Sequence, residues 1–313
     1  KTAGSKWQVM HQCQGTSQQH RLIIPAFDMT NFVEGHTGHE LDRPIKLGQL
    51  LRPRVWKMLA RHFAPGQHVL ELACGTGEDA LWLAKFPAAG DPLDVQILEA
   101  ASLSLAAHCG IRVPQHFTLP IGHGETALLS RRFDRFGANA RHRVHFLSAS
   151  ALLDIPYESS AGSYVDFARE LRRLSVSPAA DLEELFRRLI FNLLIDNSDD
   201  HLKNHGVLYA GNGRYRLSPA FDVVPQLTNL GYQMLSIEGN TQAAHLDLAI
   251  QAAPHFDLST NKASAIVKAM TMTVHGGWRH HAEATGVPDS ISKRIEACFK
   301  RQAEIMGAAM HAS

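Results

Sequence analysis

Asp199 and Asn204, near the middle of the chain, have the residue types and the spacing that phosphoryl transfer needs. They stand in the segment IDNSDDHLKNHGVLY as D-x-x-x-x-N, and a second acidic residue, Asp222, follows in RYRLSPAFDVVPQ. One carboxylate can orient an attacking hydroxyl, while an amide and a second carboxylate can hold magnesium against the phosphates of ATP. Magnesium prefers hard oxygen ligands of this kind. The pattern therefore predicts ATP-dependent chemistry at these residues.

A strong helix is expected directly before this loop. Apolar residues recur at helical spacing at Leu182, Leu185, Phe186, Leu189, Ile190, Leu193 and Leu194. This periodicity predicts a helix over residues 182–194. Asp181, followed by Glu184, is typical of an N-capping pair. We therefore expect the helix to begin there and to end before Asn197, where loop chemistry starts.

A hairpin is expected after the loop. GVLYA and RYRLS alternate like short strands, and Gly211-Asn212-Gly213 between them is typical of a tight turn. Such a hairpin folds the chain back on itself, so the sequence predicts that Asp222 returns to the neighbourhood of Asn204. Two ligands distant in sequence would then face one magnesium ion.

These segments resemble the HipA-like serine/threonine kinases, which are toxin components of bacterial toxin–antitoxin modules. The resemblance covers roughly residues 81–305 and includes further motifs in the expected order: LWLAKFP, LEAASLSLAAHCGIRVP, ALLSRRFDR and RVHFLSASALL. Several motifs in order are far more specific than one motif alone. The resemblance implies an α+β, two-lobed, protein-kinase-like fold with a small α/β N-lobe remnant and a mostly helical C-lobe.

The resemblance also implies a role for each matching residue. Asp199 would be the catalytic base, and Asn204 and Asp222 would be the magnesium ligands. Lys85 would pair with the ATP phosphates, and Glu99 is the candidate carboxylate that orients this lysine. The remaining candidates for nucleotide binding are Phe133 and its neighbour Asp134 at the hinge against adenine, and His201 and Lys203 in the catalytic loop.

Each residue also has a simpler interpretation when it is taken singly. Asp and Asn are common in polar loops for backbone reasons. Asp200 adjoins the expected base, and its simpler interpretation is a residue that shapes the loop without a catalytic role. His201 and His205 stand four apart, a spacing that can bind zinc on a helix. The glycine that follows and the missing glutamate of an HExxH motif favour a loop role for both histidines.

The segment before the kinase-like part resembles a different family. HVLELACGTGEDALWLA, with Glu71, Gly75 and Gly77, is similar to the first motif of S-adenosylmethionine-dependent methyltransferases. The two resemblances conflict, because LWLAKF would be helical in a methyltransferase and a strand in a kinase. Glu99 is contested as well, since it lies at a plausible distance to bind ribose. Strands for a complete methyltransferase sheet are not evident after residue 100, so we expect no productive site for that cofactor.

Composition and charge restrict the remaining possibilities. The 313 residues carry a net charge of +1, which gives no global basic signal for nucleic acid. The four cysteines lack metal-ligand or close disulfide spacing and fit a reducing cytoplasm, although four cysteines could in principle pair. Neither a membrane span nor a signal peptide is evident. The chain begins with Lys1 and not with Met, which is typical of a fragment, and the replaced region before the AKFP strand indicates a fused or recombined chain. The expected organisation is a poorly ordered tail (1–25), a methyltransferase-like or replaced segment (26–80), a small-lobe remnant with hinge (81–136) and a helical C-lobe (137–313).

Two principal hypotheses about function follow. The first is an ATP- and Mg²⁺-dependent serine/threonine kinase of the toxin type, favoured by the complete set Asp199, Asn204 and Asp222. The second is a degenerate scaffold that binds an antitoxin-like partner, favoured because the Gly/Ser-rich phosphate loop of the family is replaced here. A methyltransferase is a weaker alternative. The resemblance implies a translation factor such as an aminoacyl-tRNA synthetase as substrate, and a HipB-like DNA-binding antitoxin through which nucleic acid is contacted indirectly.

Overall fold

A three-stranded antiparallel sheet opens the described part of the chain. The computed structural model describes residues 82–87, 91, 93–122, 124–136, 142–156, 159, 161–227 and 231–312, with side chains as far as residue 301. The sheet has the order β1-β3-β2 and consists of β1 (Trp82–Lys85), β2 (His116–Gly122) and β3 (Glu125–Arg131). The register places Lys85 opposite Leu128. Ala84, Leu119, Ala127 and Leu129 form a small apolar core on this sheet.

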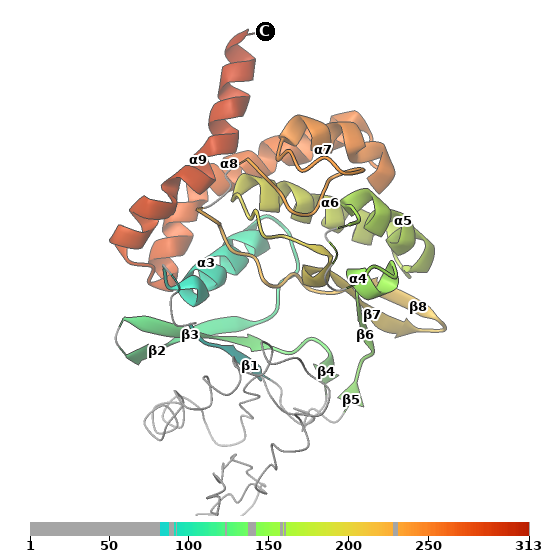
Figure 1. The fold of residues 1–313 in the computed structure, drawn as a ribbon, viewed down its shortest axis with the longest axis horizontal. Helices are drawn as coiled ribbons and strands as arrows, with labels where there is room; N and C mark the ends of the chain where they lie inside the picture. Colours follow the sequence, from blue (N-terminus) through green and yellow to red (C-terminus); the bar gives the residue numbers. More distant parts are fainter. Residues whose placement is uncertain are drawn as a thin grey trace, which may run out of the picture.

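Helix α3 (Val95–His108) covers this sheet and joins it to the rest of the molecule (Figure 1). The helix begins at Asp94, whose side chain accepts a hydrogen bond from the Ile97 amide at 3.2 Å, as an N-cap residue does. Its apolar residues belong to the large hydrophobic core, and it packs closely on α8 (Thr260–Thr285). The position of Glu99 is therefore set by both packing surfaces of α3.

Short strands connect the first sheet to the predicted hairpin. A two-stranded ribbon, β4 (Arg135–Phe136) and β5 (His142–Arg143), precedes a second sheet of order β6-β7-β8. The strands of the second sheet are β6 (Phe146–Ser148), β7 (Gly206–Gly211) and β8 (Arg214–Leu217). Gly211 pairs with Arg214, and the two turn residues have φ angles of 52° at Asn212 and 71° at Gly213. Positive φ at both positions matches the twist of an antiparallel hairpin, so the predicted hairpin is confirmed.

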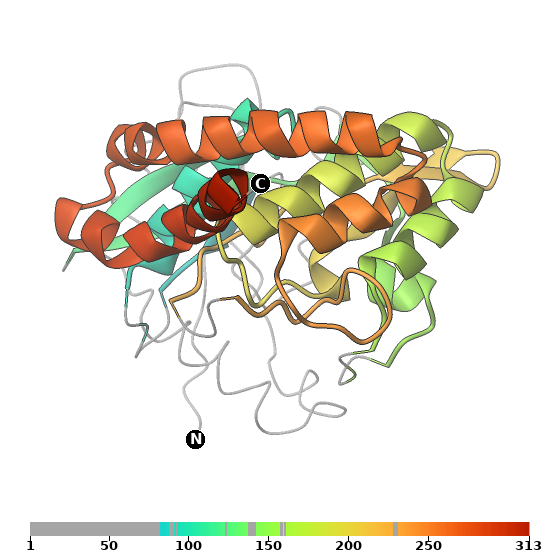
Figure 2. The ribbon, with the colours of Figure 1, turned by 90° about the horizontal axis from the view of Figure 1, so that it is seen from above.

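Helices make up most of the remaining structure and pack around α6 (Pro178–Leu194). The others are α4 (Ala149–Leu152), α5 (Tyr164–Leu174), α7 (Leu246–Ala252) and α9 (Asp289–Ala312), with 3₁₀ turns at Leu202–Asn204 and Ala253–Phe256. Figure 2 shows α8 running along one side of this layer with α9 beside it. The last turns of α9 project from the body of the protein (Figure 1). The expected α+β class is confirmed.

The expected N-capping pair of α6 is wrong. The helix begins at Pro178, after Ser177, so Asp181 lies inside its first turn. Proline is favoured at this first position, because its missing amide hydrogen would have no helical partner anyway. Asp181 instead accepts hydrogen bonds from the Ser175 hydroxyl at 2.7 Å and the Leu217 amide at 3.0 Å. It thereby joins the start of α6 to β8.

The conflict between the two sequence resemblances is decided at Trp82–Lys85. This segment is a strand, as the kinase-like interpretation predicts, and not the helix that a methyltransferase requires. Each sheet in the described part of the chain is antiparallel. The glycine turn at residues 75–77, the segment 26–80 and the tail 1–25 lie outside the described residues.

Two further observations concern cysteines and membranes. Cys109 and Cys298 are both buried free thiols, and burial raises the pKa of each to about 12. Among the helices of the described residues, none has the length and apolarity that crossing a membrane would need.

Candidate active site

The loop that carries Asp199 starts where α6 ends. Asp196, just after the helix, adopts a left-handed backbone with φ of 48° and is buried. The chain then turns so that Asp199 is exposed while Asp200 is buried. The two neighbouring acids therefore have different environments, and of the two only Asp199 is accessible to a substrate hydroxyl.

Asp200 holds the loop in place through a buried hydrogen-bond network. Its carboxylate accepts hydrogen bonds from the Tyr164 hydroxyl at 2.5 Å and from His205 Nε2 at 2.9 Å. Asn192 of α6 in turn donates to the Tyr164 hydroxyl at 2.9 Å. Burial would raise the pKa of Asp200, but His205 and the Tyr164 hydrogen bond outweigh it and hold the pKa below its ordinary value. Asp200 therefore shapes the loop, which is the role that its position beside the expected base suggests in the sequence.

Lys85 reaches from β1 to two carboxylates. Its ammonium lies 2.8 Å from each oxygen of Glu99 and 2.9 Å from Oδ1 of Asp222. Burial would lower the pKa of Lys85, but the two carboxylates outweigh it and hold the pKa above its ordinary value. Glu99 also accepts a hydrogen bond from the Asp222 amide at 3.0 Å. The predicted pair of Lys85 with Glu99 is confirmed as a contact, and it brings β1, α3 and the segment after β8 together.

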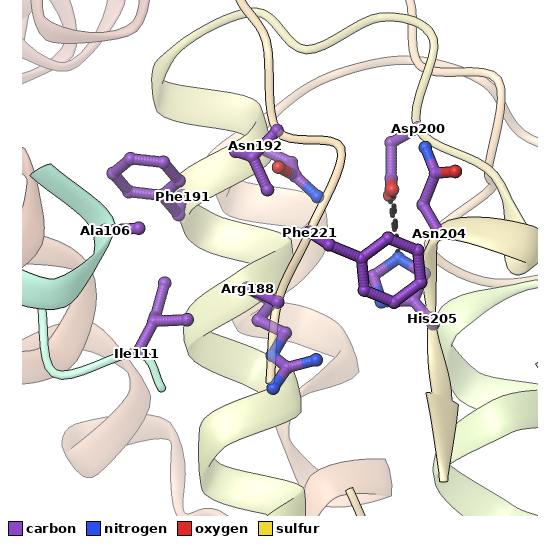
Figure 3. Close-up of a pocket in the computed structure, with 11 residues that line it drawn as sticks. Ala106, Ile111, Arg188, Phe191, Asn192, Asp200, Asn204, His205 and Phe221 are labelled. Carbon is purple, nitrogen blue, oxygen red and sulfur yellow. Dashed lines mark hydrogen bonds and ion pairs between the residues drawn. The ribbon is translucent and has the colours of Figure 1, made fainter. Parts of the chain in front are cut away.

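Asn204 and the residue before Asp222 line one pocket. Phe221, Asn204 and Asp200 are among its lining residues, and Figure 3 shows their side chains on the same side of it. Asp222 has a φ of 59° and an exposed carboxylate. One carboxylate and one amide oxygen, with phosphate oxygens supplied by a nucleotide, suit magnesium, which is usually held by one or two carboxylates plus substrate phosphates. The oxygen donors of Asn204 and Asp222 suit magnesium. That both residues bind one magnesium ion stays a prediction.

An aromatic cluster lies beside these residues. The rings of Phe133, Phe146 and Phe221 have centroids 5.8 to 6.3 Å apart, and each ring is partly exposed. A Cβ atom on Gly206 would lie 2.3 Å from the Phe146 ring. Glycine at this position therefore lets Phe146 pack directly on the first residue of β7, next to the loop that ends at Asn204.

The other candidates for nucleotide binding have mixed environments. The carboxylate of Asp134 is paired with Arg132 at 2.9 Å and with Arg135 at 2.5 Å. Burial alone would raise the pKa of Asp134, but the two arginines outweigh it and hold the pKa below its ordinary value. His201 and Lys203 lie half-buried at the 3₁₀ turn of the loop. Their contact with a nucleotide stays a prediction.

Among the described residues there is no cluster of three or more His, Cys, Asp or Glu side chains that could hold a metal. His205, one of the two histidines with zinc-like spacing, is hydrogen-bonded to Asp200.

Sequence reasoning missed three residues that shape this region. Phe146 and Phe221 complete the aromatic cluster, and Tyr164 anchors Asp200. Phe221 directly precedes Asp222, so its place at the site has a signal in the sequence. Tyr164 stands 36 positions before Asp200, and only the folded structure reveals that the two side chains meet.

Comparison with known proteins identifies the family to which this chain belongs. A family model described as the HipA-like C-terminal domain matches residues 57–278. The chain therefore belongs to the HipA-like C-terminal domain family. Its fold is similar to that of HipA from Shewanella oneidensis, solved with HipB and operator DNA, with a TM-score of 0.60 and 16% identity over 72% of this chain and 59% of that one.

Two proteins of Sinorhizobium fredii are similar in sequence. "Putative kinase Y4dM" is 34% identical over 185 residues, which is 54% of this chain and 41% of that protein. "Putative kinase Y4mE" is 32% identical over 149 residues, which is 44% of this chain and 33% of that protein. The matches thus span a third to two-fifths of the length of these relatives, and they support a kinase-like family.

Proposed function

We propose that this chain is an ATP- and Mg²⁺-dependent protein kinase that transfers the γ-phosphoryl group of ATP to a serine or threonine hydroxyl. The observation that carries the proposal is the contact of Lys85 with Glu99 and Asp222, on the same molecule as an exposed Asp199. A lysine paired with a carboxylate, an aspartate for the metal and a separate aspartate for the hydroxyl are the parts that phosphoryl transfer uses.

Each side chain has a distinct role in this proposal. Asp199 orients the attacking hydroxyl and accepts its proton late in the transfer, as an exposed carboxylate on a firmly held loop can do. Lys85 binds the phosphates and is itself held by Glu99. Asn204 and Asp222 would hold magnesium, which neutralises charge on the phosphates. Phe133, Phe146 and Phe221 offer an apolar, aromatic surface suited to a purine ring.

One observation favours a second candidate function. The carboxylate of Asp222 is bound to Lys85, so a proposed metal ligand and a proposed phosphate ligand neutralise each other. A chain that keeps this ion pair in the presence of nucleotide would be a degenerate scaffold that binds a protein partner. The kinase proposal requires that the Asp222 carboxylate leave Lys85 when nucleotide and metal enter.

The partner and the substrate are also proposals. The structural neighbour from Shewanella was solved with HipB and operator DNA. We accordingly propose a HipB-like DNA-binding antitoxin as partner, with nucleic acid contacted through that partner. The phosphorylated protein would be a translation factor such as an aminoacyl-tRNA synthetase, which is the kind of substrate that the family resemblance implies.

Calorimetric titration separates the candidate functions. The chain is titrated with ATP alone, with ATP and Mg²⁺ together, and in a separate experiment with S-adenosylmethionine. The kinase proposal predicts that ATP binds more tightly when Mg²⁺ is present and that S-adenosylmethionine gives no heat of binding. Binding of ATP that is indifferent to Mg²⁺ would favour the scaffold, and micromolar binding of S-adenosylmethionine would contradict both.

A further inference from the structure

Arg301, on helix α9, forms an ion pair with Asp196, which lies at the start of the loop that carries Asp199. Its guanidinium donates two parallel hydrogen bonds to the carboxylate of Asp196, from Nε to Oδ2 at 2.6 Å and from Nη2 to Oδ1 at 2.5 Å. The Asp196 side chain is fully buried and that of Arg301 is 19% exposed. A planar fork that meets a carboxylate at two points fixes orientation as well as distance. The contact therefore holds the loop and α9 in one arrangement.

The backbone of Asp196 connects the two halves of the candidate site. Its carbonyl oxygen accepts hydrogen bonds from the Ser198 amide at 2.9 Å and from the Gln226 amide at 3.1 Å. Ser198 directly precedes Asp199, and Gln226 lies on the segment that follows Asp222. One oxygen atom thus joins the loop of the proposed base to the segment of the proposed metal ligand, and any movement of Asp196 shifts both.

A second contact from α9 reaches the same place. The thiol of Cys298 donates a hydrogen bond to the Gln226 carbonyl at 3.3 Å. Residues three apart share one face of a helix, so Cys298 and Arg301 form a single face of α9 that holds Gln226 and Asp196. The Gly231 amide also donates to Asp196 Oδ1 at 3.3 Å, which adds a backbone donor to the same carboxylate.

The energetics explain why Arg301 matters to Asp196. A buried carboxylate is tolerated only when a partner compensates its charge, and the backbone of Asp196 is in the left-handed region, where residues other than glycine are strained. Glycine at this position would satisfy the backbone without a charge. The aspartate therefore adds an attachment to α9 that the loop conformation itself does not require.

We propose that Arg301 is a positioning residue for phosphoryl transfer, acting through Asp196 to fix the separation of Asp199 from Asp222. The inference rests on the proposed kinase function. Its particular content is that α9, which carries no proposed catalytic residue, sets the geometry of the site. Within the described part of the chain, the hydrogen bonds of Arg301 go to Asp196 and to the Ala244 carbonyl, and none goes to Asp199, Asn204 or Asp222.

The variants must separate positioning from mere folding. Arg301→Met leaves the Asp196 carboxylate buried without its arginine, and the protein can fail to fold for that reason. The double variant Asp196→Gly/Arg301→Met removes both charges, relieves the left-handed backbone and keeps the carbonyl that Ser198 and Gln226 use. Lys300→Met is the matched control, because it removes a neighbouring cation on the same helix whose ion pair is with Glu296.

Steady-state kinetics give the first readout. For the double variant we expect a thermal midpoint at or above that of the parent, with kcat and kcat/KM falling together by roughly tenfold to a hundredfold, as for a reacting group misplaced by about 1 Å. Arg301→Lys should lose less activity than the double variant but should not reach the parental kcat, since an ammonium cannot bind both oxygens of Asp196 in a fixed plane. Lys300→Met should match the parent. A double variant that transfers phosphate at the parental rate would overturn the inference.

Hydrogen exchange gives a second readout that needs no kinase activity. In the double variant, the amides of Ser198 and Gln226 should lose protection together, while both stay protected in Lys300→Met. If the parent transfers no phosphate, the proposed function fails. The exchange experiment still tests whether the Arg301–Asp196 ion pair, here called the clamp, holds the backbone at Ser198 and Gln226 in place. Unchanged protection at both amides would overturn the positioning role, whatever the activity of the parent.

Discussion

The ammonium of Lys85 lies 2.8 Å from both carboxylate oxygens of Glu99, although the two residues belong to different elements, β1 and α3. The same ammonium contacts Asp222 at 2.9 Å. Because α3 also packs on α8, the pair connects the first sheet to the helical part of the molecule. The candidate nucleotide site is therefore sensitive to the position of α3.

Replacement of Lys85 should destabilise the protein and weaken nucleotide binding. Lys85→Met leaves Glu99 buried without its cation, and we expect a loss of about 2 kcal/mol in the free energy of unfolding, less than for a fully buried pair because Lys85 is 40% exposed. The measurement is urea unfolding combined with ATP–Mg²⁺ titration. The double variant Lys85→Met/Glu99→Gln is the control. It should regain most of the stability but none of the affinity, and equal affinity in both parent and double variant would refute the assigned role of Lys85.

The raised pKa of Lys85 predicts a change in stability at alkaline pH. The folded-state pKa lies above the ordinary value of 10.5 because Glu99 and Asp222 outweigh the effect of burial. The contribution to stability is therefore complete below 10.5 and is lost as pH rises through the higher folded-state value. Unfolding measured between pH 9 and about 12 should show this loss in the parent and a smaller loss in Lys85→Met. Parallel curves for the two proteins would show that Lys85 does not titrate differently on folding.

Asp222→Ala should abolish the magnesium dependence of nucleotide binding. The substitution removes the carboxylate proposed as a metal ligand and frees Lys85 from one of its two carboxylates. We expect ATP to bind with the same affinity whether or not Mg²⁺ is present. We also expect a modest loss of stability: the Asp222 side chain is 48% exposed, but alanine tolerates its φ of 59° less well than aspartate does. Calorimetry with and without Mg²⁺ checks this. If the variant still binds ATP–Mg²⁺ as the parent does, the metal assignment is wrong.

Gly206→Ala should disturb the aromatic cluster. The new Cβ would lie 2.3 Å from the Phe146 ring and 2.7 Å from the Leu147 carbonyl oxygen, so the ring and the backbone of β6 must shift. We expect a loss of stability of about 1–3 kcal/mol together with weaker ATP binding. Gly276→Ala, in the interior of α8 with open space around its Cβ, is the matched control and should gain about 0.5–1 kcal/mol. Equal thermal midpoints in the two variants would argue against the close packing of Phe146.

Local patterns predicted the elements that position the site. The hairpin around Asn212 and the long helix before the loop each carry a short-range signal in turn residues or periodicity. The strand at Trp82–Lys85 was implied by the family resemblance and not by a local pattern. The start of α6 was missed because Asp181 and Glu184 resemble a capping pair locally. Their actual partners include Arg112, 69 and 72 positions away, and long-range pairing of this kind leaves no mark on a local pattern.

The contacts that hold the loop of Asp199 could not be predicted from the sequence. The spacing to Asn204 favours Asp199 over Asp200 as the base, but the burial of Asp200 against Tyr164 and His205 is visible only in the folded structure. The ion pair of Asp196 with Arg301 could not be predicted from the sequence either, because the arginine stands 105 positions after the aspartate. Residue types and spacing suggested which groups could do chemistry, whereas tertiary contacts decide which groups hold them in place.

Radiolabel transfer from ATP tests the central claim most directly. The parent and Asp199→Asn are incubated with γ-labelled ATP and Mg²⁺, alone and with a candidate substrate protein, and labelled protein is counted. Because Asp199 is exposed, the variant should fold and bind ATP–Mg²⁺ as the parent does, so any difference reports on the transfer itself. We predict label on protein with the parent and none above background with Asp199→Asn. Equal labelling by the two proteins would contradict the role of Asp199, and bound ATP with no labelling by either would contradict the kinase proposal and favour the scaffold.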